Sequence, residues 1–297
     1  MIPADERIAV LRTRCLERKH LAWTHTAIPR AEALRASEQV ASWQERQGLC
    51  TRHLLAQTCL DIDDLELMLG RVASRPPSAT DEAIAQADAY LGPYRLPGGQ
   101  SGHCELHVAP ALAVGIDGLV ADVRSRLATA DEEKAATYRS CLYALEGLSV
   151  MIENAAQTAA AAARGAGMAR RSELESLSSV SAWVAHHPPR TFREAIQLLW
   201  FVLLAVQHGE NVGLVGPGHL DRLLHAFYQA DLAAGTLTRD EALLYIESLY
   251  LLVNEYGADD KCHGCSELHD YQGFSWYGCK ATCPECSFQY TQGFKGG

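Results

Sequence analysis

PPRTFREAIQLLWFVLLAVQ, residues 188–207, decides the fold of this chain together with the segment GPGHLDRLLHAFYQADLAAGTLTRDEALLYIESLYLLVNE, residues 216–255. Thr191 and Thr238 are each followed three residues later by a glutamate, the spacing of a capping box, so a helix is predicted to begin at each site. The first of these helices is apolar on nearly all sides, and we expect it to be buried in a large core.

The remainder of the chain also predicts helices, because apolar residues recur at spacings of three and four. The predicted segments are residues 4–20, 31–45, 52–57, 80–91, 109–127, 132–164 and 172–186. Strand signals are sparse, and the glycine-rich segment 209–218 is expected to be a loop.

Several collinear blocks resemble the pyruvate formate-lyase domain of the glycyl radical enzymes. Besides the two segments above, they are a basic opening helix at 6–17, IDDLELMLGRVASRP at 62–76, and GQSGHCELHVAPALAVGIDG at 99–118. The resemblance implies a mainly α fold, the helical N-terminal half of such an enzyme, which in the family packs around a ten-stranded barrel. Most barrel strands are not encoded here, so the α/β barrel is expected to be incomplete. Without them, helix 193–206 is expected to expose apolar patches and to favour aggregation.

Composition excludes some classes of protein. The formal net charge of -10 leaves no basic stripe for a nucleic acid partner. No signal peptide is visible and no apolar run is long enough to span a membrane, since polar residues interrupt the alanine-rich segment 155–163. The sequence therefore predicts a cytoplasmic protein that binds neither nucleic acid nor membrane.

Composition changes sharply near Asp260. Lysine replaces arginine after this point, aromatic residues become frequent, and half of the cysteines of the chain follow. We therefore divide the chain into a partial pyruvate formate-lyase-like helical domain, residues 1–257, and a cysteine- and aromatic-rich tail, residues 258–297. A separate module, an internal deletion or a reading-frame change would each produce such a break.

One interpretation of the tail is radical chemistry. Gly264, Cys265, Ser266 and Glu267 resemble the Gly-Cys-X-Glu loop of the family, which implies a thiyl radical on Cys265 and a general base at Glu267. A thiyl radical removes hydrogen from a C–H bond, and a nearby carboxylate accepts the proton of the adjacent hydroxyl. The string around Gly293 lacks the basic residue and valine of the family's radical loop, so Gly293 is interpreted as a loop glycine.

The other chemical interpretation is a metal site, and beside these two stands the alternative that the cysteines are incidental to a disordered or mistranslated tail. Cys262 and Cys265 are two residues apart, as are Cys283 and Cys286, and four thiolates at this spacing can bind zinc. In this alternative the protein is a non-enzymatic helical scaffold or partner-binding module with a zinc-binding tail.

His103 is the candidate substrate-binding residue. In several members of the resembled family a histidine that follows a glycine in this loop reaches the active site, and Gly102 precedes His103 here. Where diol-dehydrating members carry a His-Ser pair, this chain has Gly213 and Leu214, which puts their hydroxyl contacts in doubt. Asp221 is interpreted as a helix cap.

The resemblance as a whole implies a truncated or rearranged glycyl radical lyase or acyltransferase. A complete enzyme would carry out radical C–C cleavage or elimination on a small polar substrate in anaerobic metabolism. Its glycyl radical would be installed by a separate radical S-adenosylmethionine activating enzyme with a [4Fe-4S] cluster. The resemblance also admits a homodimer. The chain alone is expected to be inactive.

Overall fold

The computed structural model describes residues 3–17, 26–72, 78–94, 101–210, 213–256, 280–282 and 289–291. Within these ranges the helices are α1 (Ala4–Glu17), α2 (Ala27–Ala36), α3 (Trp43–Gln57), α4 (Asp81–Leu91), α5 (Ala109–Leu127), α6 (Glu132–Gly165), α7 (Met168–Val184), α8 (Phe192–Glu210), α9 (Leu220–Ala234) and α10 (Arg239–Tyr256). In the same ranges, three two-stranded sheets pair β1 (Leu60–Asp61) with β2 (Arg71–Val72), β3 (Ser101–Glu105) with β4 (Gly213–Gly216), and β5 (Lys280–Thr282) with β6 (Gln289–Thr291). The fold is mainly helical, as predicted.

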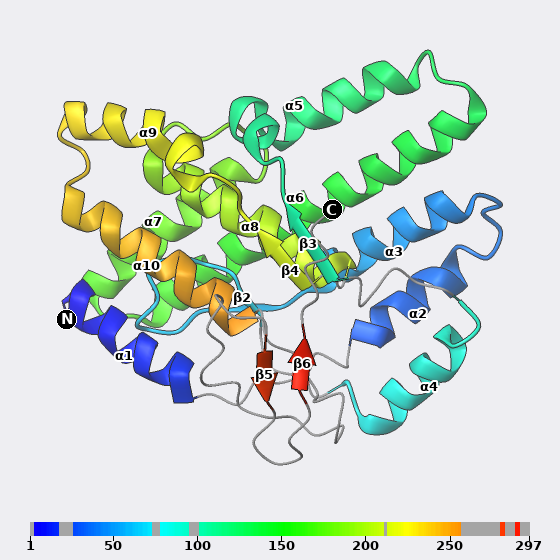
Figure 1. The fold of residues 1–297 in the computed structure, drawn as a ribbon, viewed down its shortest axis with the longest axis horizontal. Coiled ribbons are helices and arrows are strands. Elements are labelled where there is room, and N and C mark those ends of the chain that lie inside the picture. Colours follow the sequence, from blue (N-terminus) through cyan, green and yellow to red (C-terminus); the bar gives the residue numbers. More distant parts are fainter. Residues whose placement is uncertain are drawn as a thin grey trace.

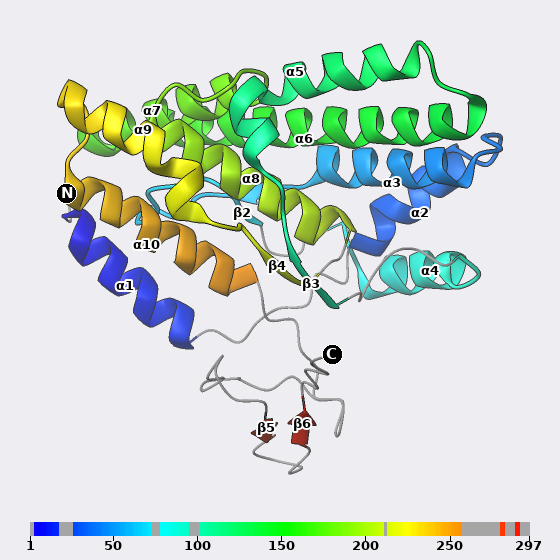
Figure 2. The same ribbon diagram turned by 45° about the horizontal axis from the view of Figure 1, so that its top comes forward.

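The long helix α6 lies at the centre of a layer of helices that also contains α3, α5 and α7. Figures 1 and 2 show α3, α5 and α7 packed along it, and α5 and α6 form an antiparallel hairpin. Two glycines bring α3 and α6 into close contact. A Cβ at Gly48 would lie 2.7 Å from the Cα of Ser140, and one at Gly147 would lie 2.7 Å from the Cα of Arg52. Neither glycine can therefore be replaced without moving the two helices apart.

Helix α8 lies at the centre of the core, and Trp200 and Phe201 on it have no exposed surface. It packs against α3, α7, α9 and α10 (Figure 1). The predicted apolar patches on 193–206 are therefore wrong, because neighbouring helices of this same chain cover them. Among the described residues, the exposed large apolar side chains are scattered over several helices: Val10, Val114, Met168, Leu243 and Tyr250.

The start of α8 is capped more extensively than the sequence predicts. The Thr191 hydroxyl accepts the backbone N–H of Glu194 at 3.2 Å, as in a capping box. The Glu194 carboxylate, however, accepts the N–H of Arg190 at 2.6 Å, one residue earlier than a capping box requires. Asp231 of α9 accepts the N–H of Phe192 at 2.8 Å. Because α9 supplies this third bond, it also fixes the direction in which α8 begins.

The capping box of α10 is complete. The Thr238 hydroxyl accepts the N–H of Glu241 at 3.2 Å, and the Glu241 carboxylate accepts the N–H of Thr238 at 2.8 Å. The Thr238 hydroxyl also donates to that carboxylate. These bonds stabilise the ionised form and lower the pKa of Glu241, the side-chain bond from Thr238 most of all.

Some predicted boundaries are wrong. The predicted helix 31–45 is two helices, α2 and α3, and the Ser42 hydroxyl caps α3 by accepting the N–H of Glu45 at 3.3 Å. The predicted loop 209–218 contains β4, and Gly102 and His103 lie in β3 rather than in a loop. In the part of the chain that the structure describes, no helix is both long and apolar enough to cross a membrane.

Candidate active-site region

Strands β3 and β4 bring together two segments that are far apart in the sequence. They pair in parallel, with Ser101 opposite Gly213, Cys104 opposite Val215 and Glu105 opposite Gly216. Figure 2 shows the pair crossing beneath α8, in the gap between α10 and α4. A two-stranded parallel sheet is rare by itself, because parallel sheets are usually larger and covered on both faces. Within the described residues, both outer edges of this pair lack a partner strand.

The pair contains an irregularity at the predicted substrate residue. Between the first two pairs of the register, β3 advances by three residues and β4 by two, so Gly102 and His103 together face Leu214. This is the count of a β-bulge, a feature that redirects side chains and is frequent beside active sites. The side chains of residues 101–104 and 211–214 lie outside the described part of the structure, so His103 is placed by its backbone alone.

Gly218 follows β4 and packs against Glu105 at the end of the strand pair. The backbone N–H of Leu106 donates to the Gly216 carbonyl at 3.1 Å and extends the ladder by one bond. Gly218 has φ +79, and a Cβ there would lie 2.7 Å from Oε1 of Glu105. Only glycine fits this conformation and this space. The chain then enters α9. The N-cap of this helix is His219, so the prediction that Asp221 is the cap was wrong. Asp221 lies in the first turn, where its negative charge interacts favourably with the positive end of the helix dipole.

The end of α8 is fixed by an arginine from a distant helix. Arg30 of α2 donates to the carbonyl of Gly209 at 2.8 Å and approaches that of His208 at 3.4 Å. Such carbonyls at the end of a helix have no partner within it, and a cation there also opposes the helix dipole. Arg30 therefore stabilises the C-terminal end of α8, which precedes β4 in the chain.

Side chains from the middle of α8 bind the backbone of the segment that connects β1 to β2. The Gln197 amide accepts the N–H of Leu69 at 3.0 Å and donates to the Leu69 carbonyl at 2.8 Å, as a strand neighbour would. The Trp200 indole N–H donates to the Gly70 carbonyl at 3.2 Å. Gly70 has φ +123, and a Cβ there would overlap the indole. The family-like block at 62–76 thus contains a backbone turn shaped to the buried face of α8.

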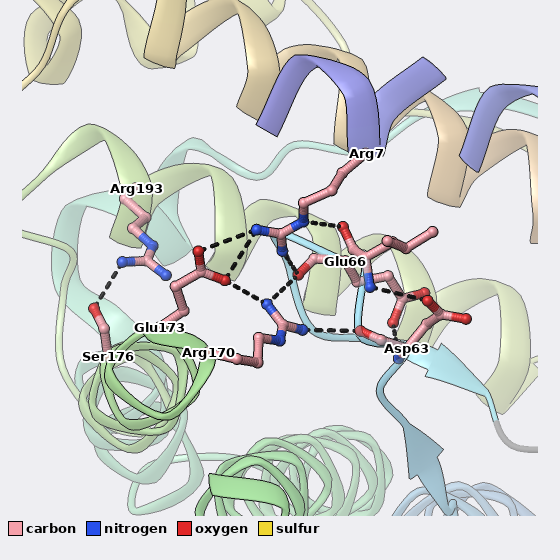
Figure 3. A network of polar contacts seen from close by, with 8 residues as sticks. Arg7, Asp63, Glu66, Arg170, Glu173, Ser176 and Arg193 are labelled. Atoms are coloured by element: carbon pink, nitrogen blue, oxygen red, sulfur yellow. Dashed lines mark hydrogen bonds and ion pairs between the residues drawn. The ribbon is translucent and has the colours of Figure 1, made fainter. Parts of the chain in front are cut away.

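A network of charges joins α1, the 63–66 turn and α7. Figure 3 shows Arg7 and Arg170 converging on Glu173. Arg7 bonds both oxygens of Glu173 at 3.0 Å, and Arg170 bonds one at 2.7 Å. Arg7 also donates to the carbonyls of Leu65 at 3.0 Å and Glu66 at 3.1 Å.

A cavity of about 460 Å³ opens beside this network, between the end of α6, the start of α7 and residues 62–65. Arg7 and Arg170 line this cavity, but their terminal guanidinium nitrogens are already bonded to Glu173 and to backbone carbonyls. We therefore interpret the network as a structural cross-link and not as a catalytic group.

The remaining predicted site residues lie outside the described residues. These are Cys262, Cys265, Glu267, Cys283 and Cys286, together with Gly293. In the described ranges, no group of three or more His, Cys, Asp or Glu side chains can hold a metal ion. Both interpretations of the tail therefore stay predictions.

His186 has partners that the sequence analysis missed. Its ring nitrogens lie 3.1 Å from Asp117 of α5 and 2.7 Å from Glu153 of α6. These hydrogen bonds, first that of Asp117 and then that of Glu153, raise the pKa of His186. Asp117 is 69 residues and Glu153 is 33 residues away in sequence, so no local pattern signals either contact.

The helical layers around β3 and β4 have the fold of one part of a glycyl radical enzyme. A B12-independent glycerol dehydratase from Clostridium butyricum superposes with a TM-score of 0.75 over 84% of this chain and 39% of its own, at 18% identity. A hydroxyproline dehydratase from Clostridioides difficile superposes with a TM-score of 0.74 over 86% of this chain and 41% of its own, at 20% identity. At these identities the likeness establishes the fold alone.

Sequence comparison assigns the family. Residues 96–261, more than half of the chain, match the pyruvate formate lyase-like family model. The isethionate sulfite-lyase of Nitratidesulfovibrio vulgaris is 36% identical over 88 residues, which are 29% of this chain and 11% of that protein. The (2S)-3-sulfopropanediol dehydratase of Klebsiella oxytoca is 29% identical over 161 residues, 52% of this chain and 20% of that protein. This chain belongs to the pyruvate formate lyase-like family, and it spans well under half the length of these relatives.

Proposed function

We propose that this chain is the helical N-terminal part of a glycyl radical lyase or dehydratase that acts on a small polar substrate. The observation that carries the proposal is the parallel pair β3–β4, which has a bulge at His103, the predicted substrate-binding residue. His103 also lies within residues 96–261, the part of the chain that matches the family. A parallel pair with unpaired edges fits the beginning of a larger sheet better than a finished one.

The proposed substrate is a small molecule with a hydroxyl next to the reacting carbon. Relatives are named for isethionate, sulfopropanediol, hydroxyproline and glycerol, which are all small polar molecules with a hydroxyl group. In this proposal His103 orients the substrate. The Cys265 thiol would give its hydrogen atom to the glycyl radical of the complete enzyme, and the resulting sulfur radical would take a hydrogen atom from the substrate carbon. Glu267 would accept the proton of the hydroxyl as the leaving group departs with its bonding electron pair, and the product radical would take the hydrogen atom back from the Cys265 thiol.

Two partners belong to this proposal. One is a radical S-adenosylmethionine activating enzyme, which installs the radical. The other is the remainder of the barrel, which must pair with the open edges of β3 and β4 and exclude water and oxygen from the radical. Residues 1–257 would form the helical domain, and residues 258–297 would carry the cysteine loop. We propose a cytoplasmic location and leave open a homodimer.

The first experiment tests the isolated chain. The purified 297-residue protein is incubated anaerobically with an activating enzyme and S-adenosylmethionine, and examined by EPR. We expect no glycine-centred doublet and no turnover of isethionate, glycerol or hydroxyproline. A doublet from this polypeptide alone would refute the proposal that it is inactive alone.

The second experiment tests the complete enzyme. The DNA on both sides of the coding sequence is read, and a frame that encodes the missing barrel and a radical glycine loop is co-expressed with this chain. We expect an EPR doublet and lyase or dehydratase activity that His103→Ala abolishes. His107→Ala is the matched control, because His107 follows β3 closely and is exposed. Absence of any such frame would contradict the proposal.

The competing function is a helical scaffold with a zinc-binding tail. The specific observation in its favour is the pair of Cys-X-X-Cys spacings at 262–265 and 283–286. Stoichiometric zinc in the purified chain that is lost in Cys262→Ser and in Cys283→Ser, but kept in Cys59→Ser, would favour the scaffold. Cys59 is a suitable control because it is free and exposed.

A further inference from the structure

His186 joins three helices through a single side chain. It follows the end of α7, its Nδ1 lies 3.1 Å from Oδ1 of Asp117 on α5, and its Nε2 lies 2.7 Å from Oε1 of Glu153 on α6. All three side chains are partly exposed, at 36%, 60% and 42% respectively. Protons can therefore exchange freely with solvent at this site.

The two contacts can form together only when the imidazole is charged. A neutral imidazole has one N–H, so its other nitrogen would present a lone pair to a carboxylate. The imidazolium form donates at both nitrogens, and each bond is then assisted by charge. Loss of one proton thus breaks at least one of the two links between helices.

These links lie at a kink in the helix that follows the candidate active-site strand. Gly115 interrupts α5 with φ +70 and ψ 178. A Cβ there would lie 2.5 Å from both the carbonyl carbon of His187 and the nitrogen of Pro188. The N–H of Asp117 donates to the His186 carbonyl at 3.0 Å. The segment after α7 therefore contacts the kinked part of α5 in two ways, through its backbone carbonyl at His186 and through the His186 ring.

Other ionisable groups near His186 do not replace these carboxylates. The ring of His187 lies 6.2 Å from that of His186, centroid to centroid, and packs on Trp183 at 4.3 Å. The Arg190 guanidinium lies 3.7 Å from the centroid of the same Trp183 ring, and it bonds Glu194. Asp117 and Glu153 are thus the groups that decide the charge of His186.

We propose that His186 is a proton-controlled latch that fixes the kinked start of α5 to α6 and to the end of α7. When it opens, the part of α5 that follows the kink, residues 117–120, loosens. The order of the helix that follows the candidate active-site strand would then depend on the surrounding pH.

The direction of the effect follows from the two carboxylates. They raise the pKa of His186 above its usual value of 6.5. A group whose pKa is raised by folding stabilises the folded form fully below its unfolded pKa and loses that contribution as the pH rises through the folded pKa. The latch is therefore closed in mildly acidic solution and opens as the solution becomes alkaline.

The test is hydrogen exchange of the full chain at pH 6 and pH 9. Protection factors are compared for amides after the kink, residues 117–120, and for the distant helix α10. We expect protection at 117–120 to fall by roughly two- to fivefold between the two pH values, the range for an exposed ion pair. Protection in α10 should stay constant.

Three variants separate the latch from ordinary packing. His186→Gln should show the same protection at 117–120 at both pH values. Glu153→Gln should keep the latch closed at pH 9, because a side-chain amide can donate to neutral Nε2 while Nδ1–H donates to Asp117. The control is His53→Gln, which removes another exposed histidine that lies 3.1 Å from a carboxylate, Glu32. A wild-type response that persists in His186→Gln or in Glu153→Gln, or one that disappears in His53→Gln, would overturn the proposal.

Discussion

The substitution Gly70→Ala tests how strictly the turn before β2 is shaped to α8. Gly70 has φ +123, a conformation that alanine adopts only with strain of about 1–3 kcal/mol. The added methyl group would overlap the Trp200 indole, which has no exposed surface and cannot move aside, and overpacking of this kind costs about 1–3 kcal/mol.

The displaced indole would also lose its hydrogen bond to the Gly70 carbonyl, worth about 1 kcal/mol. We therefore expect Gly70→Ala to lower the free energy of unfolding by roughly 3–7 kcal/mol, measured by urea denaturation. Gly165→Ala is the matched control. A Cβ at Gly165 meets nothing within 4 Å, so its effect should be within about 1 kcal/mol of zero.

A double-mutant cycle identifies the cause. Trp200→Phe shortens the ring that the new methyl group meets, so Gly70→Ala should cost less in the Trp200→Phe background than in the wild type. If the two effects simply add, the overlap is not the reason for the loss. A cost of Gly70→Ala no larger than that of Gly165→Ala would refute the whole argument.

Three further effects are expected in denaturation experiments. Arg7→Met should cost about 2–4 kcal/mol because Arg7 is buried and its loss leaves Glu173 without one partner. Arg126→Met, which breaks an exposed pair, should have a much smaller effect. Thr238→Ala should cost about 0.5–2 kcal/mol because it removes the α10 cap. The pKa of Glu241 is lowered in the folded chain, so its contribution is present above its usual value of 4.5 and should fade as acid is added; in Thr238→Ala this part of the pH profile should flatten.

Helices were predictable because their signals are local. Apolar spacing predicted α4 and α5 closely, and the Thr-X-X-Glu pattern placed the starts of α8 and α10. The break between α2 and α3 was missed, although Ser42 and Glu45 form the same pattern and could have indicated it. The apolar spacing continues across the break, so this spacing alone predicts one helix where the structure has two.

The strands of the candidate site were missed for a different reason. Gly102, Gly213 and Gly216 are poor strand formers, and each of the two segments is short. Each strand exists because it pairs with another that is more than 100 residues away, which no local window contains. The family resemblance drew attention to His103, yet only the register of β3 and β4 places it at a bulge.

The enclosure of α8 has a consequence for biosynthesis. Its large apolar side chains are buried by helices that precede α8 in the sequence and by α9 and α10, which follow it and end before residue 257. Domains tend to fold as they leave the ribosome, amino-terminal end first. This shell can thus close over Trp200 and Phe201 once α10 has left the ribosome, and the most apolar helix of the described chain is then shielded from contact with other nascent chains.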